Sequence, residues 1–193
     1  TTGSVEVQFN QSVTGLPFVN QGAISFYPGV DAKVTIAAGV DADGVQLVAS
    51  AAKSILVVAG DGAQVGQIVG SAGTDTVTAG NNVTFNGIVM GDSEKATVTV
   101  GSGAVFNTQF VMNAHYTTMD VTAGNNAVFN CDVNMAGQFA DKSLTLGDNA
   151  TVKGTVYMFG DGSVAARLFR VDIVPPVGDG AAPDGRTVRG CGQ

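Results

Sequence analysis

A repeat of 21 to 23 residues runs through the middle of the chain and limits its fold more than any other feature of the sequence. Four copies are marked by a column of glycines: Gly80, Gly101, Gly124 and Gly147. Three residues before each glycine comes Val or Leu, five residues after comes Phe or Val, and ten or eleven after comes Met. These columns are Val77, Val98, Val121 and Leu144; Phe85, Phe106, Phe129 and Val152; and Met90, Met112, Met135 and Met158. A worn copy surrounds Gly60, and a fainter one surrounds Ile36 and Gly39. Such a period is typical of units that stack on one another.

Composition restricts the units to β-structure. The chain has 193 residues, of which 45% are hydrophobic and 13% charged, and it contains 27 Gly. Average globular chains carry roughly 25% charged residues, whereas disordered chains combine high charge with little apolar material. Strong helix formers are sparse, while Gly and β-branched residues are abundant. The sequence therefore favours one all-β domain.

The pattern inside each unit predicts how the units fold. Alternation such as Thr97-Val98-Thr99 indicates short strands, and the Gly, Asn and Asp clusters between them indicate corners. A single coil of this size cannot bury its apolar face, but stacked coils bury it together. We therefore predict a parallel β-solenoid, right-handed, of about five to six coils over residues 32–163. The glycine column, followed by Asn or Asp, is expected to supply positive φ at the corners. A sandwich of antiparallel strands is the alternative.

The two ends differ from the repeat. Residues 1–31 are expected to form a strand or cap segment in which Val5, Val7 and Phe9 alternate with polar residues, outside the repeat register. Residues 164–193 are expected to form a last strand at 168–174 and a Pro- and Gly-containing arm at 175–193. An uncovered end of a parallel sheet is a template for pairing with another chain. The candidate assembly residues are Val5, Val7, Phe9, Leu168, Phe169, Arg170, Arg186 and Arg189.

The net charge and the first residues of the sequence limit the classes of function that the chain is expected to have. The net charge is -7, and a negative chain with no basic patch is a poor partner for nucleic acid. No apolar run is long enough to span a membrane. The sequence begins at Thr1 without an initiator Met, from which we expect an exported protein whose leader was removed. Cys131 and Cys191 are candidates for one disulfide, within one chain or between two, and Asn10, Asn82 and Asn149 lie in glycosylation sequons.

One segment resembles a calcium-binding motif. Residues 70–78, Gly-Ser-Ala-Gly-Thr-Asp-Thr-Val-Thr, resemble the nonapeptide of RTX proteins, with Ser71 in place of a glycine. In that family each ion sits between successive nonapeptides, and the next nine residues here lack the pattern. Calcium prefers carboxylate and amide oxygens, so it is a candidate ion at corner acids. The acids to test are Asp61, Asp75, Asp92, Asp148 and Asp161.

Catalytic patterns are absent from the sequence. His115 is the one histidine. The chain resembles left-handed β-helix acyltransferases in coil stacking, but those proteins repeat in hexads, which this chain does not. Polysaccharide lyases, which also use parallel β-helices, have clustered basic and acidic residues that this repeat lacks. A general base needs partners around it, and no Ser/His/Asp pattern, phosphate-binding loop or zinc spacing occurs. We expect no enzymatic activity.

Two polar columns accompany the core columns. If the Val column points inward, Thr78, Thr99, Thr122 and Thr145 point outward. This face resembles the Thr-x-Thr surface of solenoid ice-binding proteins over four coils, although Asp120 and Ser143 interrupt the neighbouring column. In the two earlier, degenerate coils, Val58 and Ala37 are expected at the position of this Thr column. Thr is also an ordinary residue of a solvent-facing strand. Asn86, Asn107 and Asn130 are expected to form a hydrogen-bonding ladder.

These observations lead to one functional hypothesis and two alternatives. Over residues 32–162 the chain resembles the β-solenoid repeats of secreted adhesins, surface-layer proteins and phage tail fibres. We expect an exported structural protein at the cell surface or outside the cell, with itself as partner, that assembles into a filament, sheath or surface layer. Its terminal segments would exchange, or edge strands would pair. The alternatives are a glycan-binding fibre or adhesin module and an ice-binding solenoid. Deleting residues 175–193 is expected to abolish polymerisation but leave a folded solenoid.

Overall fold

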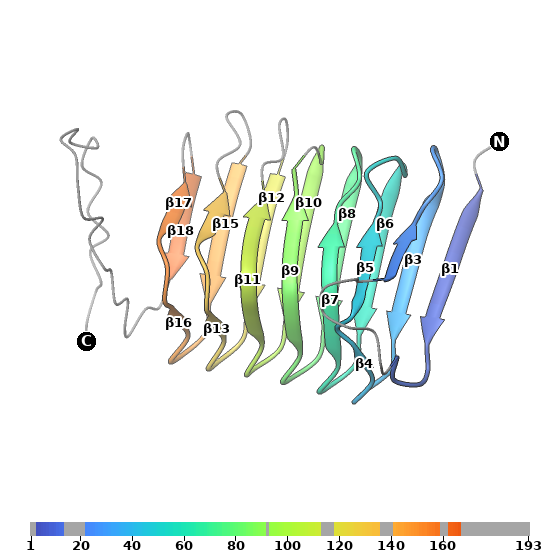
Figure 1. Ribbon diagram of the computed structural model, residues 1–193. Coiled ribbons are helices and arrows are strands. Elements are labelled where there is room, and N and C mark those ends of the chain that lie inside the picture. Colours follow the sequence, from blue (N-terminus) through green and yellow to red (C-terminus); the bar gives the residue numbers. More distant parts are fainter. Residues whose placement is uncertain are drawn as a thin grey trace.

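The protein is a β-solenoid of about six turns, built from parallel strands stacked in two facing sheets (Figure 1). The computed structural model describes residues 3–13, 22–91, 93–112, 118–135 and 141–158, together with the backbone of 162–166. No helix occurs in these ranges, and the pairings between strands are all parallel. The predicted all-β fold and parallel stacking are therefore confirmed.

The first sheet has eight strands, which follow one another along the stack. Neighbouring strands pair in register, and each residue lies beside one that is 20 to 23 positions away along most of the stack. In order, the strands are β1 (Ser4–Phe9), β3 (Asp31–Ile36), β6 (Ser54–Ala59), β8 (Thr74–Ala79), β10 (Lys95–Val100), β12 (Thr118–Ala123), β15 (Asp141–Leu146) and β18 (Gly162–Ala166).

The second sheet faces the first and is less regular. Its main path is β2 (Gly22–Ser25), β5 (Val45–Val48), β7 (Gln64–Val69), β9 (Thr84–Met90), β11 (Val105–Met112), β13 (Val128–Phe129) and β16 (Thr151–Val152). Three short strands lie beside this path, namely β4 (Asp41–Ala42), β14 (Val133–Met135) and β17 (Val156–Met158). The register shifts between Phe106 and Gln109, and the next two turns break into the pairs β13/β14 and β16/β17.

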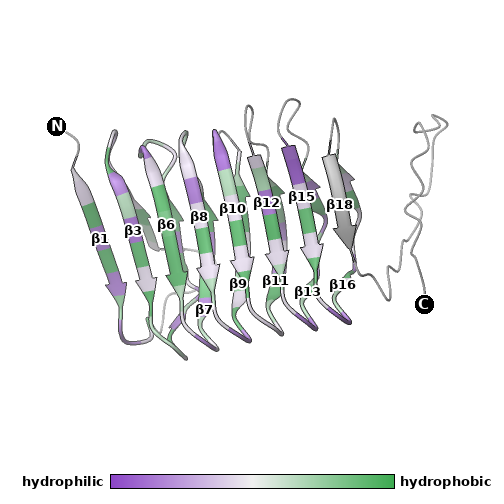
Figure 2. Cartoon of the chain, turned by 180° about the vertical axis from the view of Figure 1, so that it is seen from behind, coloured by the Kyte–Doolittle hydropathy of each residue, from purple (hydrophilic) through white to green (hydrophobic). Residues whose placement is uncertain are grey.

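Identical or similar side chains stack along the axis of the core. Val77, Val98, Val121 and Leu144 are register partners across the first sheet and are buried. Hydrophobic bands also cross the strands of the first sheet in Figure 2. At roughly 1.5–3 kcal/mol for each fully buried large apolar side chain, such columns supply most of the stability of the fold.

The aromatic column of the second sheet is packed ring on ring. The Phe106 ring lies 5.1 Å from that of Phe85 and 4.4 Å from that of Phe129, with interplanar angles of 8° and 11°. Phe110 meets Phe106 edge-on at 5.1 Å. In the Met column, Met90 pairs with Met112 and Met135 pairs with Met158. Strand spacing fixes these contacts, because parallel neighbours lie about 4.8 Å apart.

Corner geometry differs from the sequence-based expectation. Positive φ occurs two residues after the glycine column, at Asn82, Gly103, Asn126 and Asn149, with φ between 57° and 71°. The column glycines themselves are not in that region. They are needed because the chain passes close to the preceding turn: a Cβ on Gly124 would lie 2.7 Å from the Gly101 carbonyl carbon. The expectation that the glycine column supplies positive φ is therefore wrong.

The first turns also differ from the expected alignment. β1 pairs with β3 in register from Ser4–Asp31 to Phe9–Ile36, so its placement outside the repeat register is wrong. Gly39 has positive φ like Gly62 and Asn82, and therefore belongs to the later corner position, not to the glycine column. The Thr-column position of that turn is Thr35, which pairs with Val58, and not Ala37. The handedness of the coil stays a prediction.

Candidate functional site

The end of the stack formed by β1 leaves part of the core uncovered. Val5, Val7 and Phe9 pair with Ala32, Val34 and Ile36, which are fully inside the core. Val5 is nevertheless 38% exposed, and Val7 and Phe9 are only partly buried. The side chains face inward, but they pack against a neighbouring turn on one side only. This leaves apolar surface at the first end of the solenoid.

The backbone of β1 has a free edge as well. Among the described strands, β1 pairs only with β3. Its pairing shows no register shift, and its sequence contains no proline. Glu6 is the one charge on the strand; it forms an ion pair with Lys33 at 2.9 Å, whose hydrogen bond lowers the pKa of Glu6. Natural proteins block edge strands with prolines, bulges and inward charges, and β1 has none of these.

The opposite end of the first sheet is β18, which pairs with β15 through residues 162–166. The other candidate assembly residues, Leu168, Phe169, Arg170, Arg186 and Arg189, lie outside the described residues, as do the predicted strand at 168–174 and the arm at 175–193. His115 and Cys191 also lie outside them.

The RTX-like segment forms a buried hydrogen-bonded cluster around Asp75. This carboxylate is fully buried, and burial raises its pKa. Its oxygens accept hydrogen bonds from the Ser71 N–H at 2.9 Å and from the hydroxyls of Ser71 and Ser93. Ile55 and Ala96 occupy the same column on the neighbouring strands. The Asp75 side chain therefore points into the solenoid and is satisfied by donors of the protein itself.

Two other candidate calcium ligands lie at corners. Asp61 Oδ1 accepts a hydrogen bond from the Asn81 N–H at 2.7 Å, and Asn125 Oδ1 accepts one from the Asp148 N–H at 2.8 Å. These side chains join the corner of one turn to the next. Asp92 and Asp161 are outside the described residues. Within the described part of the chain, no three His, Cys, Asp or Glu residues are grouped so that they could hold a metal ion.

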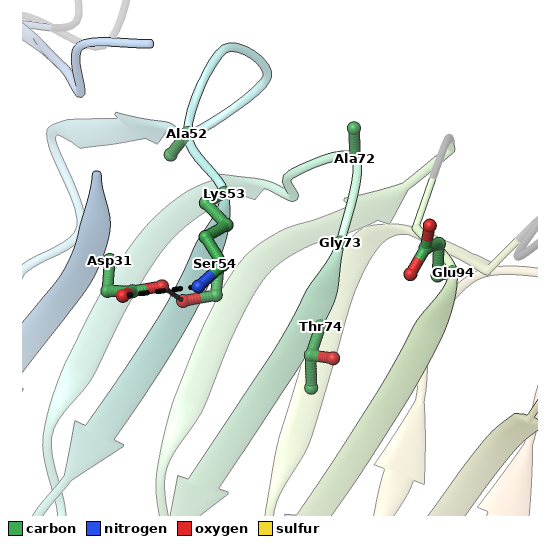
Figure 3. A pocket seen from close by; sticks show the side chains of 8 residues that line it. All are labelled: Asp31, Ala52, Lys53, Ser54, Ala72, Gly73, Thr74 and Glu94. Atoms are coloured by element: carbon green, nitrogen blue, oxygen red, sulfur yellow. Dashed lines mark hydrogen bonds and ion pairs between the residues drawn. The ribbon is translucent and has the colours of Figure 1, made fainter. Parts of the chain in front are cut away.

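A shallow groove lies where β3, β6 and β8 begin, with a volume of about 540 Å³ (Figure 3). On one side, Asp31 accepts a hydrogen bond from Ser54 at 2.7 Å and lies 3.8 Å from the Lys53 ammonium. Glu94 lies on the other side, beyond Thr74. The polar side chains next to β3 therefore interact with one another through a hydrogen bond and an ion pair.

The Thr column is present on the outer face of the first sheet. Thr78, Thr99, Thr122 and Thr145 are register partners and are exposed. The column beside it is half-buried, and there the Ser143 hydroxyl donates to Asp120 at 2.7 Å.

The Asn ladder is shorter than expected. The Asn130 amide donates to Asn107 Oδ1 at 3.1 Å. Asn86 is buried, and its amide donates to the Asp43 carbonyl at 3.0 Å.

A second groove, of about 470 Å³, crosses β11, β14 and β17 on the second sheet. We call it the amide groove, because Gln109, Asn130 and Asn134 line it together with Asp132 and Tyr157. It arises where β11 shifts register and the next two strands break. Sequence reasoning missed it, because Gln109, Asn134 and Tyr157 belong to no repeating column of the sequence.

Cys131 also lines the amide groove, and it forms no disulfide with any residue that the structure describes. Burial raises its pKa to about 11, with a further contribution from the nearby Asp132 carboxylate. The thiol is therefore protonated at neutral pH and is a weak nucleophile, because the thiolate is the reactive form.

Comparison with protein-family models, with curated proteins and with solved structures finds no match. None of the described segments forms a helix that is long and apolar enough to cross a membrane. The function of this chain is therefore inferred from its own geometry.

Proposed function

We propose that this is an exported structural protein that assembles end to end into an extracellular filament, sheath or surface layer. The observation that carries the proposal is the free edge of β1, with inward-facing Val5, Val7 and Phe9 partly exposed. Another strand on this edge would pair with the backbone of β1 and cover these side chains. Buried apolar surface contributes about 25 cal/mol per Å² to such a joint.

The partner that this edge fits is the last strand of a second copy. All strands of the first sheet are parallel and in register, so a β18 from another molecule beside β1 would continue the sheet. By register, Val164 then continues the column of Leu144 and meets Val7. A joint between two different surfaces of the same molecule is heterologous, and when it does not close into a ring it produces an open filament.

Disulfide trapping tests the joint. In a background of Cys131→Ser and Cys191→Ser, we expect Val5→Cys together with Gly162→Cys to form disulfides between molecules. Register places these two positions side by side in the joint. In one molecule they are seven strand intervals of about 4.8 Å apart, beyond the reach of a disulfide. Non-reducing electrophoresis should show a ladder of dimers, trimers and larger species.

The single variants are the control. Either Val5→Cys or Gly162→Cys alone can give at most disulfide-linked dimers, so a ladder must require both. Electron microscopy of the unmodified protein should show ordered polymers. Persistent isolated monomers, or a double variant that never exceeds a dimer, would overturn the end-to-end joint. Deleting residues 175–193 distinguishes two ways in which the molecules could assemble. If the shortened protein still polymerises, the joint forms by edge pairing. If it no longer polymerises but keeps a folded solenoid, the joint forms by exchange of the arm.

A further inference from the structure

We propose that the amide groove binds a neutral carbohydrate chain. The groove is lined from three successive turns: Thr108–Val111 of β11, residues 130–132 with Asn134, and Gly154 with Tyr157. The groove therefore crosses three neighbouring turns of the solenoid. Its volume of about 470 Å³ lies within the roughly 300–1,000 Å³ of small-molecule sites.

The hydrogen-bonding groups of the groove suit hydroxyl groups. Gln109 and Asn130 are exposed, and every amide side chain carries both donors and an acceptor. A sugar hydroxyl is likewise donor and acceptor, so it can pair with either end of an amide. Asn134 Oδ1 is a buried acceptor that has no hydrogen-bond partner among the described residues. A buried acceptor left unpaired is unfavourable, so a rotation of the Asn134 amide that brings this oxygen to a ligand hydroxyl would be favourable.

The apolar side of a sugar ring also has a partner. Tyr157 is a large aromatic side chain that is 38% exposed, and by register it lies directly beside Asn134. An aromatic ring presents an apolar face, while its hydroxyl reaches toward polar groups. The combination of one exposed ring and several amides matches a pyranose unit, which has an apolar face and a polar rim.

Charge and spacing argue for a neutral, extended chain. Of the described residues that line the groove, Asp132 carries the one charge, so phosphorylated, sulfated or carboxylated ligands gain no cationic partner. The groove takes residues from three successive turns, and neighbouring strands lie about 4.8 Å apart, which is close to the length of one pyranose unit in an extended glycan. A short oligosaccharide can therefore place one sugar on each turn.

Titration with defined oligosaccharides tests the proposal. The probes are cellotetraose, mannotetraose and chitotetraose, with a sulfated heparin tetrasaccharide as the anionic comparison, in saturation-transfer NMR and calorimetry at millimolar concentration. We expect at least one neutral tetramer to bind. Tyr157→Ala and Asn134→Leu should each weaken that binding about tenfold or more. Gln109→Ala, at an exposed position, provides a third variant that should keep the fold.

The matched control is Tyr27→Ala, because Tyr27 is 78% exposed and does not line the groove. It should leave binding unchanged, and circular dichroism should show the same β-structure in all variants. Three results would overturn the proposal: no neutral tetramer binds, the heparin tetrasaccharide binds more tightly than all of them, or binding is unchanged in Tyr157→Ala and Gln109→Ala. None of these results bears on the end-to-end joint, which lies at β1 and β18.

Discussion

A single buried carboxylate shows how the chain departs from its repeat at the scale of one residue. Asp75 is a fully buried carboxylic acid, and it stands in a column where its neighbours Ile55 and Ala96 are apolar. Three donors from Ser71 and Ser93 surround it. Buried polar groups are tolerated when they are hydrogen-bonded, and this cluster links the corners before β8 and β10.

Asp75 should give the protein a specific dependence on pH. Burial raises its pKa in the folded state above the usual 3.8, so the folded protein holds this proton more tightly than the unfolded chain. Its contribution to the free energy of unfolding is complete below about pH 3.8 and declines as the pH rises through the raised pKa. Asp75→Asn does not titrate. Urea unfolding from pH 3.5 upward should therefore show the wild type losing stability relative to this variant.

Comparison with the variant cancels the titration of the other acids, because both proteins share them. The result that contradicts the account of Asp75 is a difference between wild type and variant that stays constant or moves in favour of the wild type as the pH rises.

At the scale of the element, the corner brings the backbones of successive turns into close contact. Two positions of the corner have different backbone requirements. At the glycine column, the chain approaches the backbone of the preceding turn closely. Two residues later, φ is positive, at Asn82, Gly103, Asn126 and Asn149. The side chain between them, such as Asn81 or Asn125, accepts the N–H of the following turn. Backbone contacts and side-chain hydrogen bonds therefore both hold successive corners together.

Substitution at the glycine column should be destabilising for steric reasons. Gly124→Ala places a Cβ 2.7 Å from the Gly101 backbone, so the two turns must separate. We expect the free energy of unfolding to fall by about 1–3 kcal/mol. The control is Gly91→Ala, where a Cβ meets nothing within 4 Å and the change should stay within about 0.5 kcal/mol. Equal denaturation midpoints for the two variants would argue against close packing at the corner.

The fold was predictable from the sequence because each element repeats. Like residues recur at one interval, and stacking is the arrangement that buries Phe85, Phe106 and Phe129 together. The first turns were misaligned because Gly39 looks like a column glycine but has the positive φ of the later corner position. The amide groove was not predictable, because Gln109, Asn134 and Tyr157 are outward residues with no common type. Irregular features leave no periodic signal.

At the scale of the whole molecule, the described first sheet ends in two different strands, β1 and β18. Charge placed in the end joint should therefore act on assembly alone. Val7→Lys puts an ammonium group at an inward position of β1, where it would have to be buried in a joint with a second copy. We expect this variant to stay monomeric at concentrations where the wild type polymerises, as measured by light scattering and electron microscopy. Thr99→Lys, on the exposed face of β10, is the control and should polymerise normally.

Unchanged polymers of Val7→Lys would place the joint away from β1. If circular dichroism shows that the variant loses structure, the disulfide ladder remains the decisive measurement, since Val5→Cys is a smaller change at an exposed position.

Register pairing between successive turns also determines how such a molecule can change in length. The strands β10, β12 and β15 pair in register with the turn before and the turn after, so a tandem duplication of residues 101–123 would insert one more layer of about 4.8 Å between similar neighbours. Phe106 and Val121 would simply meet copies of themselves. Genes for such chains can therefore grow or shrink in whole layers, while the surfaces at the two ends keep their shape.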